Sequence, residues 1–155
     1  MHFRIRGLPA EQFAPFFSMS DQELATHGGV RQIADARNPG YPCRVSLRDS
    51  NPGDELILLN YEHHAVASPY RMRFAIYVRS GDETFDAVDR IPEQLRVRTL
   101  AVRAFDADGM MIGHALIDGK ELEGAISRLF ADARAAYLHI HFAAPGCYAA
   151  QVERA

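Results

Sequence analysis

The sequence predicts an α+β domain in which a mainly antiparallel, or mixed, sheet carries helices on its apolar face. Four segments alternate between apolar and polar side chains, which is the period of a strand with one buried face. These segments are residues 43–47, 72–79, 98–105 and 137–142. Residues 118–130 instead have helical spacing, which indicates one longer amphipathic helix. Its apolar stripe consists of Leu122, Ile126, Leu129 and Phe130.

Local signals predict the remaining elements. Residues 3–6 alternate as a first strand, and Pro9 is suited to the first turn of a short helix. Ser20 and Glu23 form a capping box that begins a second short helix. The helices are therefore expected to form a single layer, with short N-terminal helices beside the longer helix near 118–130. Further strands are predicted at residues 30–36, 56–59, 111–117 and 148–152, with a helical turn at 92–96.

Size and charge limit the classes of protein to which the chain belongs. A length of 155 residues and a mass of 17.3 kDa fit one domain spanning residues 1–155. The net charge of −3 and the pI of about 6.1 argue against nucleic-acid binding, which usually needs a basic domain. No stretch approaches the roughly 20 apolar residues of a membrane span, and no signal peptide is recognisable. We therefore expect a cytoplasmic protein with neither nucleic acid nor membrane as a partner.

The polar sides of the four alternating segments are rich in arginine, histidine and tyrosine and contain no carboxylate. Their arginines are Arg44, Arg48, Arg71, Arg73, Arg79 and Arg103. Such a surface is either the solvated side of an antiparallel sheet, balanced by acidic loops, or a site for an anionic ligand.

We hypothesise that this Arg/His/Tyr-rich face binds a small anionic molecule, a carboxylate or a phosphate. The planar guanidinium group binds both anions in bidentate fashion, and Arg44, Arg73 and Arg103 are the candidates for this role. Histidine moves protons near neutral pH, so His139 and His141 are candidates for acid–base catalysis or for orienting the ligand.

Three further candidates lie near the expected mouth of this site. Tyr61 and His63 follow the strand at 56–59, and Cys147 follows the Pro145–Gly146 turn, so all three are predicted to contact the ligand. Glu62 is either a catalytic base or a salt-bridge partner of the arginines, and the second role is favoured.

The pair His139 and His141 also permits a metal site. No cofactor is predicted, but zinc or iron bound by both histidines with His63 or Glu62 is an alternative. The favoured interpretation is two pocket histidines that form hydrogen bonds. His63 and His64 are adjacent, so they are expected to point to opposite faces of their strand.

The two cysteines are expected to be free thiols in a reducing compartment. Cys43 is either a nucleophile activated by a histidine of the polar face or a buried structural residue. The second interpretation is favoured because Val45 and Leu47 share its apolar face. Cys147 follows Pro145–Gly146 and is expected to be the more exposed thiol.

Three blocks of the chain resemble a bacterial protein family. They are residues 41–49 (YPCRVSLRD), residues 58–63 (LLNYEH), and residues 139–142 (HIHF) with the following Pro145-Gly146-Cys147. The family is the domain-of-unknown-function family number twelve hundred and three, and the resemblance extends over the whole chain. It implies a bacterial single-domain protein. Because the family has no assigned activity, it implies no role for any residue.

Three functions are therefore open, and the sequence leaves undecided whether the protein is an enzyme. The leading hypothesis is the binding of a small anion, with or without acid–base catalysis. The second is a metal-dependent enzyme centred on His139 and His141. The third is a non-enzymatic module whose polar face recognises an acidic partner or a second subunit in a homodimer.

Overall fold

The computed structural model describes all residues from Met1 to Ala155 and confirms the α+β class. The larger of its two antiparallel sheets has six strands in the order β5-β1-β9-β8-β6-β7. These strands are β1 (Phe3–Arg6), β5 (Asp86–Val88), β6 (Thr99–Phe105), β7 (Met111–Asp118), β8 (Tyr137–Phe142) and β9 (Tyr148–Arg154).

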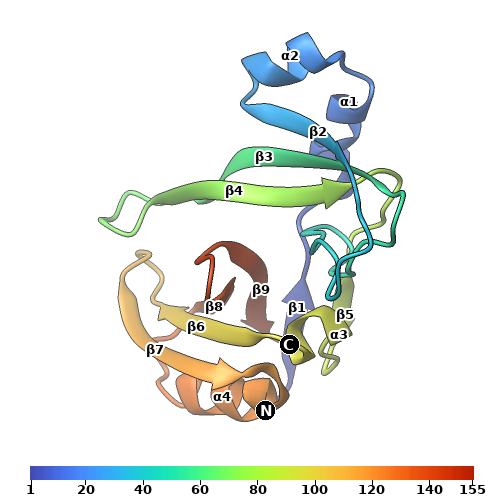
Figure 1. The fold of residues 1–155 in the computed structure, drawn as a ribbon. Coiled ribbons are helices and arrows are strands. Elements are labelled where there is room, and N and C mark those ends of the chain that lie inside the picture. Colours follow the sequence, from blue (N-terminus) through green and yellow to red (C-terminus); the bar gives the residue numbers. More distant parts are fainter.

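A smaller, three-stranded sheet lies over the larger one (Figure 1). It consists of β2 (Gly29–Ile33), β3 (Glu55–His64) and β4 (Met72–Arg79) in that order. The alternating segments therefore do not share one sheet, since 72–79 is β4 of the smaller sheet and 98–105 and 137–142 belong to the larger. As a result, the polar sides of β6 and β8 face another sheet.

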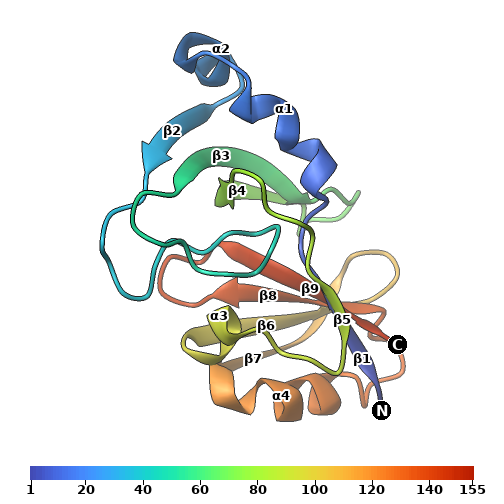
Figure 2. The same ribbon diagram turned by 90° about the vertical axis from the view of Figure 1, so that its right-hand side faces the viewer.

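Helices lie on the two outer sides of this pair of sheets (Figures 1 and 2). Beside the smaller sheet are a 3-10 turn (Ala10–Gln12), α1 (Ala14–Phe17) and α2 (Asp21–Thr26). On the far side of the larger sheet is α4 (Leu122–Leu129), preceded by a 3-10 turn (Gly119–Glu121), whereas the short α3 (Glu93–Arg96) lies beside that sheet, near β5 and β6. The helices were expected to form a single layer. Instead, the N-terminal helices and α4 lie on opposite sides of the two sheets. None of these helices has the length and apolarity needed to cross a membrane.

The helix starts follow the capping signals of the sequence. The hydroxyl of Ser20 accepts a hydrogen bond from the backbone N–H of Glu23, and the Glu23 carboxylate accepts one from the backbone N–H of Ser20. Before α4, the Asp118 carboxylate likewise accepts a hydrogen bond from the backbone N–H of Lys120. Each box satisfies N–H groups that a helix start would leave without a partner.

Residues 43–47 do not form the predicted strand. Cys43 makes only an isolated bridge to Tyr77, and a turn follows it. The backbone N–H of Cys43 donates to the carbonyl of Arg48, and Leu47 has a φ of 52°, which lies outside the extended region. The segment is therefore a loop, and its side chains do not alternate between two faces.

The main hydrophobic core lies between the larger sheet and α4. The apolar residues of β6 and β8 belong to it, as the alternation predicts: Leu100, Val102, Ala104, Leu138, Ile140 and Phe142. Since strand side chains alternate, Arg103 of β6 and His139 and His141 of β8 point to the opposite side, toward the smaller sheet. The predicted polar face exists, but it is buried between two sheets.

Candidate functional site

An irregularity in β3 brings two adjacent histidines into one pocket. Tyr61 pairs with Phe74 and His64 pairs with Met72, so β3 contains one residue more than β4 between these pairs. Such a bulge interrupts the alternation of side chains, and both His63 and His64 line the pocket. The prediction that they point to opposite faces is therefore wrong.

Strands β6 and β8 form the opposite wall. Arg103 and His139 are direct partners in the pairing of these strands, and His141 follows on the same face. The two β8 histidines are 2% and 1% exposed because the smaller sheet covers them. Arg103 remains partly exposed. Two histidines from each sheet and one arginine thus meet between the layers.

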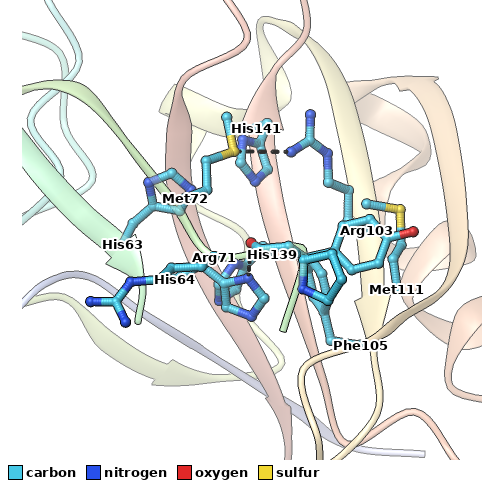
Figure 3. A pocket seen from close by; sticks show the side chains of 11 residues that line it. His63, His64, Arg71, Met72, Arg103, Phe105, Met111, His139 and His141 are labelled. Carbon is cyan, nitrogen blue, oxygen red and sulfur yellow. Dashed lines mark hydrogen bonds between the residues drawn. The ribbon is translucent and has the colours of Figure 1, made fainter. Parts of the chain in front are cut away.

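These residues enclose a pocket of about 160 Å³ (Figure 3). The ring centroid of His63 lies 5.4 Å from that of His141 and 6.1 Å from that of His139. The ring of His64 lies 4.8 Å from that of His139. We refer to this cavity, lined by the four histidines and Arg103, as the histidine pocket.

Two of the pocket histidines are fixed by hydrogen bonds. His64 Nδ1 is bonded to the carbonyl oxygen of Tyr70 and its Nε2 to the hydroxyl of Tyr137, each at 2.8 Å. His141 Nδ1 is bonded to the carbonyl oxygen of Gly146 at 3.1 Å. A hydrogen bond to one ring nitrogen sets the tautomer and the orientation of the other.

The other two histidines have a buried nitrogen without a partner. Neither His63 Nδ1 nor His139 Nδ1 forms a hydrogen bond. A buried polar atom with no partner carries a desolvation cost of about 1–3 kcal/mol. Both residues line the pocket, but these two nitrogen atoms are themselves buried.

The environment keeps His63, His139 and His141 neutral at pH 7. Burial, reinforced by the charge of neighbouring histidines, lowers the pKa of His63 to about 4 and that of His139 to about 2. Burial and the nearby Arg103 lower the pKa of His141 to about 3. These imidazoles therefore act as neutral hydrogen-bonding groups unless a negative charge enters the pocket.

Arg103 is the cation of the pocket that lacks a counter-charge. Its Nη1 contacts only the sulfur of Met72, at 3.7 Å, the contact drawn as a dashed line in Figure 3. Burial lowers the pKa of its guanidinium group. The second arginine at the pocket, Arg71, is paired with Glu62 at 2.6 Å. No carboxylate lines the pocket, so its interior carries a net positive charge.

The family model described as "Protein of unknown function (DUF1203)" matches residues 40–154. The chain belongs to this family. The matched segment contains β3 to β9, and with them all the histidines of the pocket and Arg103. It begins after β2, so it covers less than the whole chain that the sequence resemblance was expected to include. No curated protein and no solved structure matches the chain.

In this DUF1203 protein the residues suggested as metal ligands meet, but not with the geometry of a metal centre. His139 and His141 have ring centroids 6.3 Å apart, and His63 lies near both. No three His, Cys, Asp or Glu side chains are arranged so that they could hold a metal ion. Glu62, the alternative ligand, is paired with Arg71 instead.

Three predicted site residues lie in a different place. Tyr61, Glu62 and Arg73 line a separate, open cleft beside α1. The Tyr61 hydroxyl donates to Gln12 Oε1 at 3.1 Å, and Arg73 Nε donates to the side-chain oxygen of Asn60. The structure therefore does not bring these residues to the histidines. For Glu62, the favoured role as an arginine's salt-bridge partner is confirmed.

Arg44 and Cys147 line another pocket, so Arg44, Arg73 and Arg103 do not surround one common ligand. Both thiols are buried, and Cys147, at 7% exposed, is more exposed than Cys43, at 0%, as expected. Cys43 is buried in a hydrophobic cluster, as predicted, and burial raises the pKa of its thiol.

Sequence reasoning missed His64 and Met72 of the histidine pocket, and it missed the contact of Tyr148 with His63. His64 was assigned to the wrong face because a bulge leaves no sequence signal that alternation can detect. Met72 was assigned to the core with the apolar set of its strand, but it contacts Arg103 at the pocket. Tyr148 stacks on His63 with ring centroids 5.0 Å apart, a contact between different sheets that only the tertiary fold creates.

Proposed function

We propose that the protein binds a small anion, a carboxylate or a phosphate group, in the histidine pocket. The observation that carries this proposal is that the pocket contains Arg103 without a carboxylate partner. Arg103 is partly withdrawn from water, and withdrawing a charge from water is unfavourable unless an opposite charge accompanies it. An anion bound beside Arg103 would supply that charge.

The neutral imidazoles suit the same ligand. An N–H group of His63 or His139 can donate to an anion's oxygen, because both residues line the pocket and a neutral imidazole ring carries one N–H donor. A bound negative charge would raise the pKa of these rings and allow one to gain a proton. The site would then be able to move a proton to or from the ligand, which is the minimum that acid–base catalysis needs.

The size of the pocket limits the ligand. Its volume of about 160 Å³ is close to that of a cavity of about 150 Å³ that admits a benzene molecule. Short-chain carboxylates and inorganic phosphate are of this size, whereas nucleotides are too large. Burial of His139 and His141 between the sheets also favours a small ligand over a protein partner on this face.

The proposal is tested by titrating the protein with sodium acetate and with sodium phosphate. We expect the histidine side-chain signals of nitrogen-15 NMR spectra to shift in a saturable manner for at least one of these anions. Arg103→Gln should weaken binding by roughly tenfold or more, since a hydrogen bond to a charged group contributes about 1.5–3 kcal/mol.

Arg73→Gln is the matched control, because Arg73 is exposed on β4 and lines the other cleft. Affinity should be unchanged in this variant. Equal affinity in the wild type and Arg103→Gln, or no shift of any histidine signal, would refute the proposal.

Elemental analysis of the purified protein separates this proposal from the metal alternative. The unpartnered nitrogens of His63 and His139 are the one feature that would also suit a metal ion. A stoichiometric transition metal that is lost in a His139→Gln variant would favour the metal centre over the anion site.

A further inference from the structure

A second pocket, of about 440 Å³, lies at the turn between β8 and β9. Its walls come from the loop after β2, which includes Arg37 and Tyr41, and from the turn that includes Pro145 and Cys147. Arg44 and Arg98 also line it. We refer to this cavity as the arginine pocket. It shares no lining residue with the histidine pocket.

Arg44 is buried at the base of the arginine pocket, with 1% of its surface exposed. Its Nε donates to the carbonyl of Tyr148 at 2.7 Å, its Nη1 to the carbonyl of Pro42 at 2.5 Å, and its Nη2 to the Cys147 sulfur at 2.9 Å. Each terminal nitrogen has a second N–H, for which the structure provides no acceptor. The buried guanidinium group of Arg44 can therefore donate further hydrogen bonds.

The charge of Arg44 has no carboxylate to balance it. Arg98, which lies against the same Phe142 ring as Arg44, is neutralised by Asp49 at 3.0 Å. Arg37 only stacks on Tyr41. Burial lowers the pKa of Arg44, and the neighbouring Cys147 opposes this shift. The pocket thus carries excess positive charge, and the Cys147 sulfur is the side-chain atom that accepts a hydrogen bond from Arg44.

The two thiols of the chain differ in their access to a pocket. Cys147 lines the arginine pocket and accepts the hydrogen bond from Arg44. Cys43 is 0% exposed and lies in the cluster beneath the smaller sheet. A guanidinium group beside a sulfur stabilises the thiolate, which is the nucleophilic form. Of the two thiols, only Cys147 combines this neighbour with a place in the wall of a pocket.

We propose that the arginine pocket is a thiol-modification site, where an organic disulfide bearing carboxylates binds to the arginines and forms a mixed disulfide with Cys147. This inference goes beyond anion binding in the histidine pocket and does not depend on it. Arg44 holds the sulfur and supplies the buried positive charge, while Arg37 at the exposed rim attracts the carboxylates of the disulfide.

The exchange needs no additional oxidant. The Cys147 thiol loses its proton to solvent, and the resulting thiolate attacks one sulfur of the disulfide. The sulfur–sulfur bond of the reagent breaks as the new bond to Cys147 forms, and the second sulfur leaves as a thiolate that solvent can protonate. A free thiol in solution reverses the modification by the same reaction.

The test compares two disulfides of opposite charge, glutathione disulfide and cystamine, on the folded full-length protein. Peptide mass mapping follows the modification of each cysteine with time. We expect glutathione disulfide to modify Cys147 at least roughly tenfold faster than cystamine, because focusing of an anion by a positive cleft raises association rates by about 10–10³-fold. Cys43 should stay unmodified.

Arg37→Gln should reduce this charge preference, since Arg37 is exposed and its loss need not disturb the fold. Arg48→Gln, an exposed arginine outside the arginine pocket, is the control and should preserve the preference. Arg44→Met should slow modification by both reagents, with circular dichroism to verify folding. The proposal is overturned if cystamine reacts as fast as glutathione disulfide, or if neither modifies Cys147 faster than Cys43.

Discussion

The imidazole ring of His63 stacks on the phenol ring of Tyr148, with 5.0 Å between their centroids and 17° between their planes. His63 belongs to β3 of the smaller sheet and Tyr148 to β9 of the larger one. This contact therefore fixes the distance between the sheets at the histidine pocket. Offset stacking of this kind adds about 0.5–1.5 kcal/mol to the free energy of burial.

We expect Tyr148→Ala to lower the free energy of unfolding by about 3–5 kcal/mol, the usual cost of removing a buried aromatic ring. Tyr148 is 3% exposed, so the cavity could not collapse freely. Tyr148→Phe retains the ring and should cost much less. Urea denaturation of both variants measures the difference. A similar loss in the two variants would show that the hydroxyl, rather than the ring, stabilises this position.

Tyr137→Phe should lower the free energy of unfolding by about 1–3 kcal/mol. The substitution removes the hydroxyl bonded to His64 Nε2 and leaves a polar atom of a buried ring without a partner. Tyr70→Phe is the control, since His64 is bonded to the backbone carbonyl of Tyr70 and not to its hydroxyl. Thermal or urea unfolding should show no change for the control; equal effects would contradict the assigned role.

The protein should lose stability as the pH falls below about 6.5. The pKa values of His63, His139 and His141 in the folded state lie near 4, 2 and 3, so these rings stay neutral while their unfolded counterparts gain protons. Since the unfolded chain binds more protons, the free energy of unfolding rises with pH and falls on acidification. Each histidine contributes up to about 1.4 kcal/mol per pH unit in this window.

His139→Gln should reduce this slope, because one buried ionisable group is removed. Urea denaturation at a series of pH values between 4 and 7 measures the slope for both proteins. His27→Gln is the control, since this ring lies outside the histidine pocket and is exposed. An unchanged slope in His139→Gln would show that burial does not keep His139 neutral.

The affinity for acetate should increase as the pH is lowered from 7 to 5.5. A bound carboxylate raises the pKa of the imidazoles around it, and a ligand that raises a pKa binds more tightly when protons are abundant. Acetate itself keeps its charge over most of this range. Calorimetric titration at several pH values measures the trend. A constant affinity would mean that no histidine gains a proton on binding.

Much of the fold could be predicted because its signals are local. The alternation in β4, β6 and β8 identified their strands, and in β6 and β8 it also identified the side turned to the core, since a strand has a fixed period of two residues. The capping box at Ser20 likewise marked the start of a helix. By contrast, residues 43–47 form a loop although their apolar and polar side chains alternate. The alternating stretch is too short to distinguish a strand from a loop.

The candidate site could be predicted only in part. His139, His141 and Arg103 were placed on one face correctly, because they lie in regular strands that pair with each other. Arg44 and Arg73 were added on the assumption of a single sheet, and the structure separates them. Which elements share a sheet depends on pairing between distant segments, and local periodicity does not encode that choice.

The sequence by itself determined that one side of β6 and β8 carries Arg103, His139 and His141 and lacks carboxylates. Only the tertiary structure decided that a second sheet covers this side, that a bulge adds His64, and that Arg103 stays unpaired. The physical reason is that composition fixes the charge of a surface, whereas burial and the distances between side chains fix what that charge can bind.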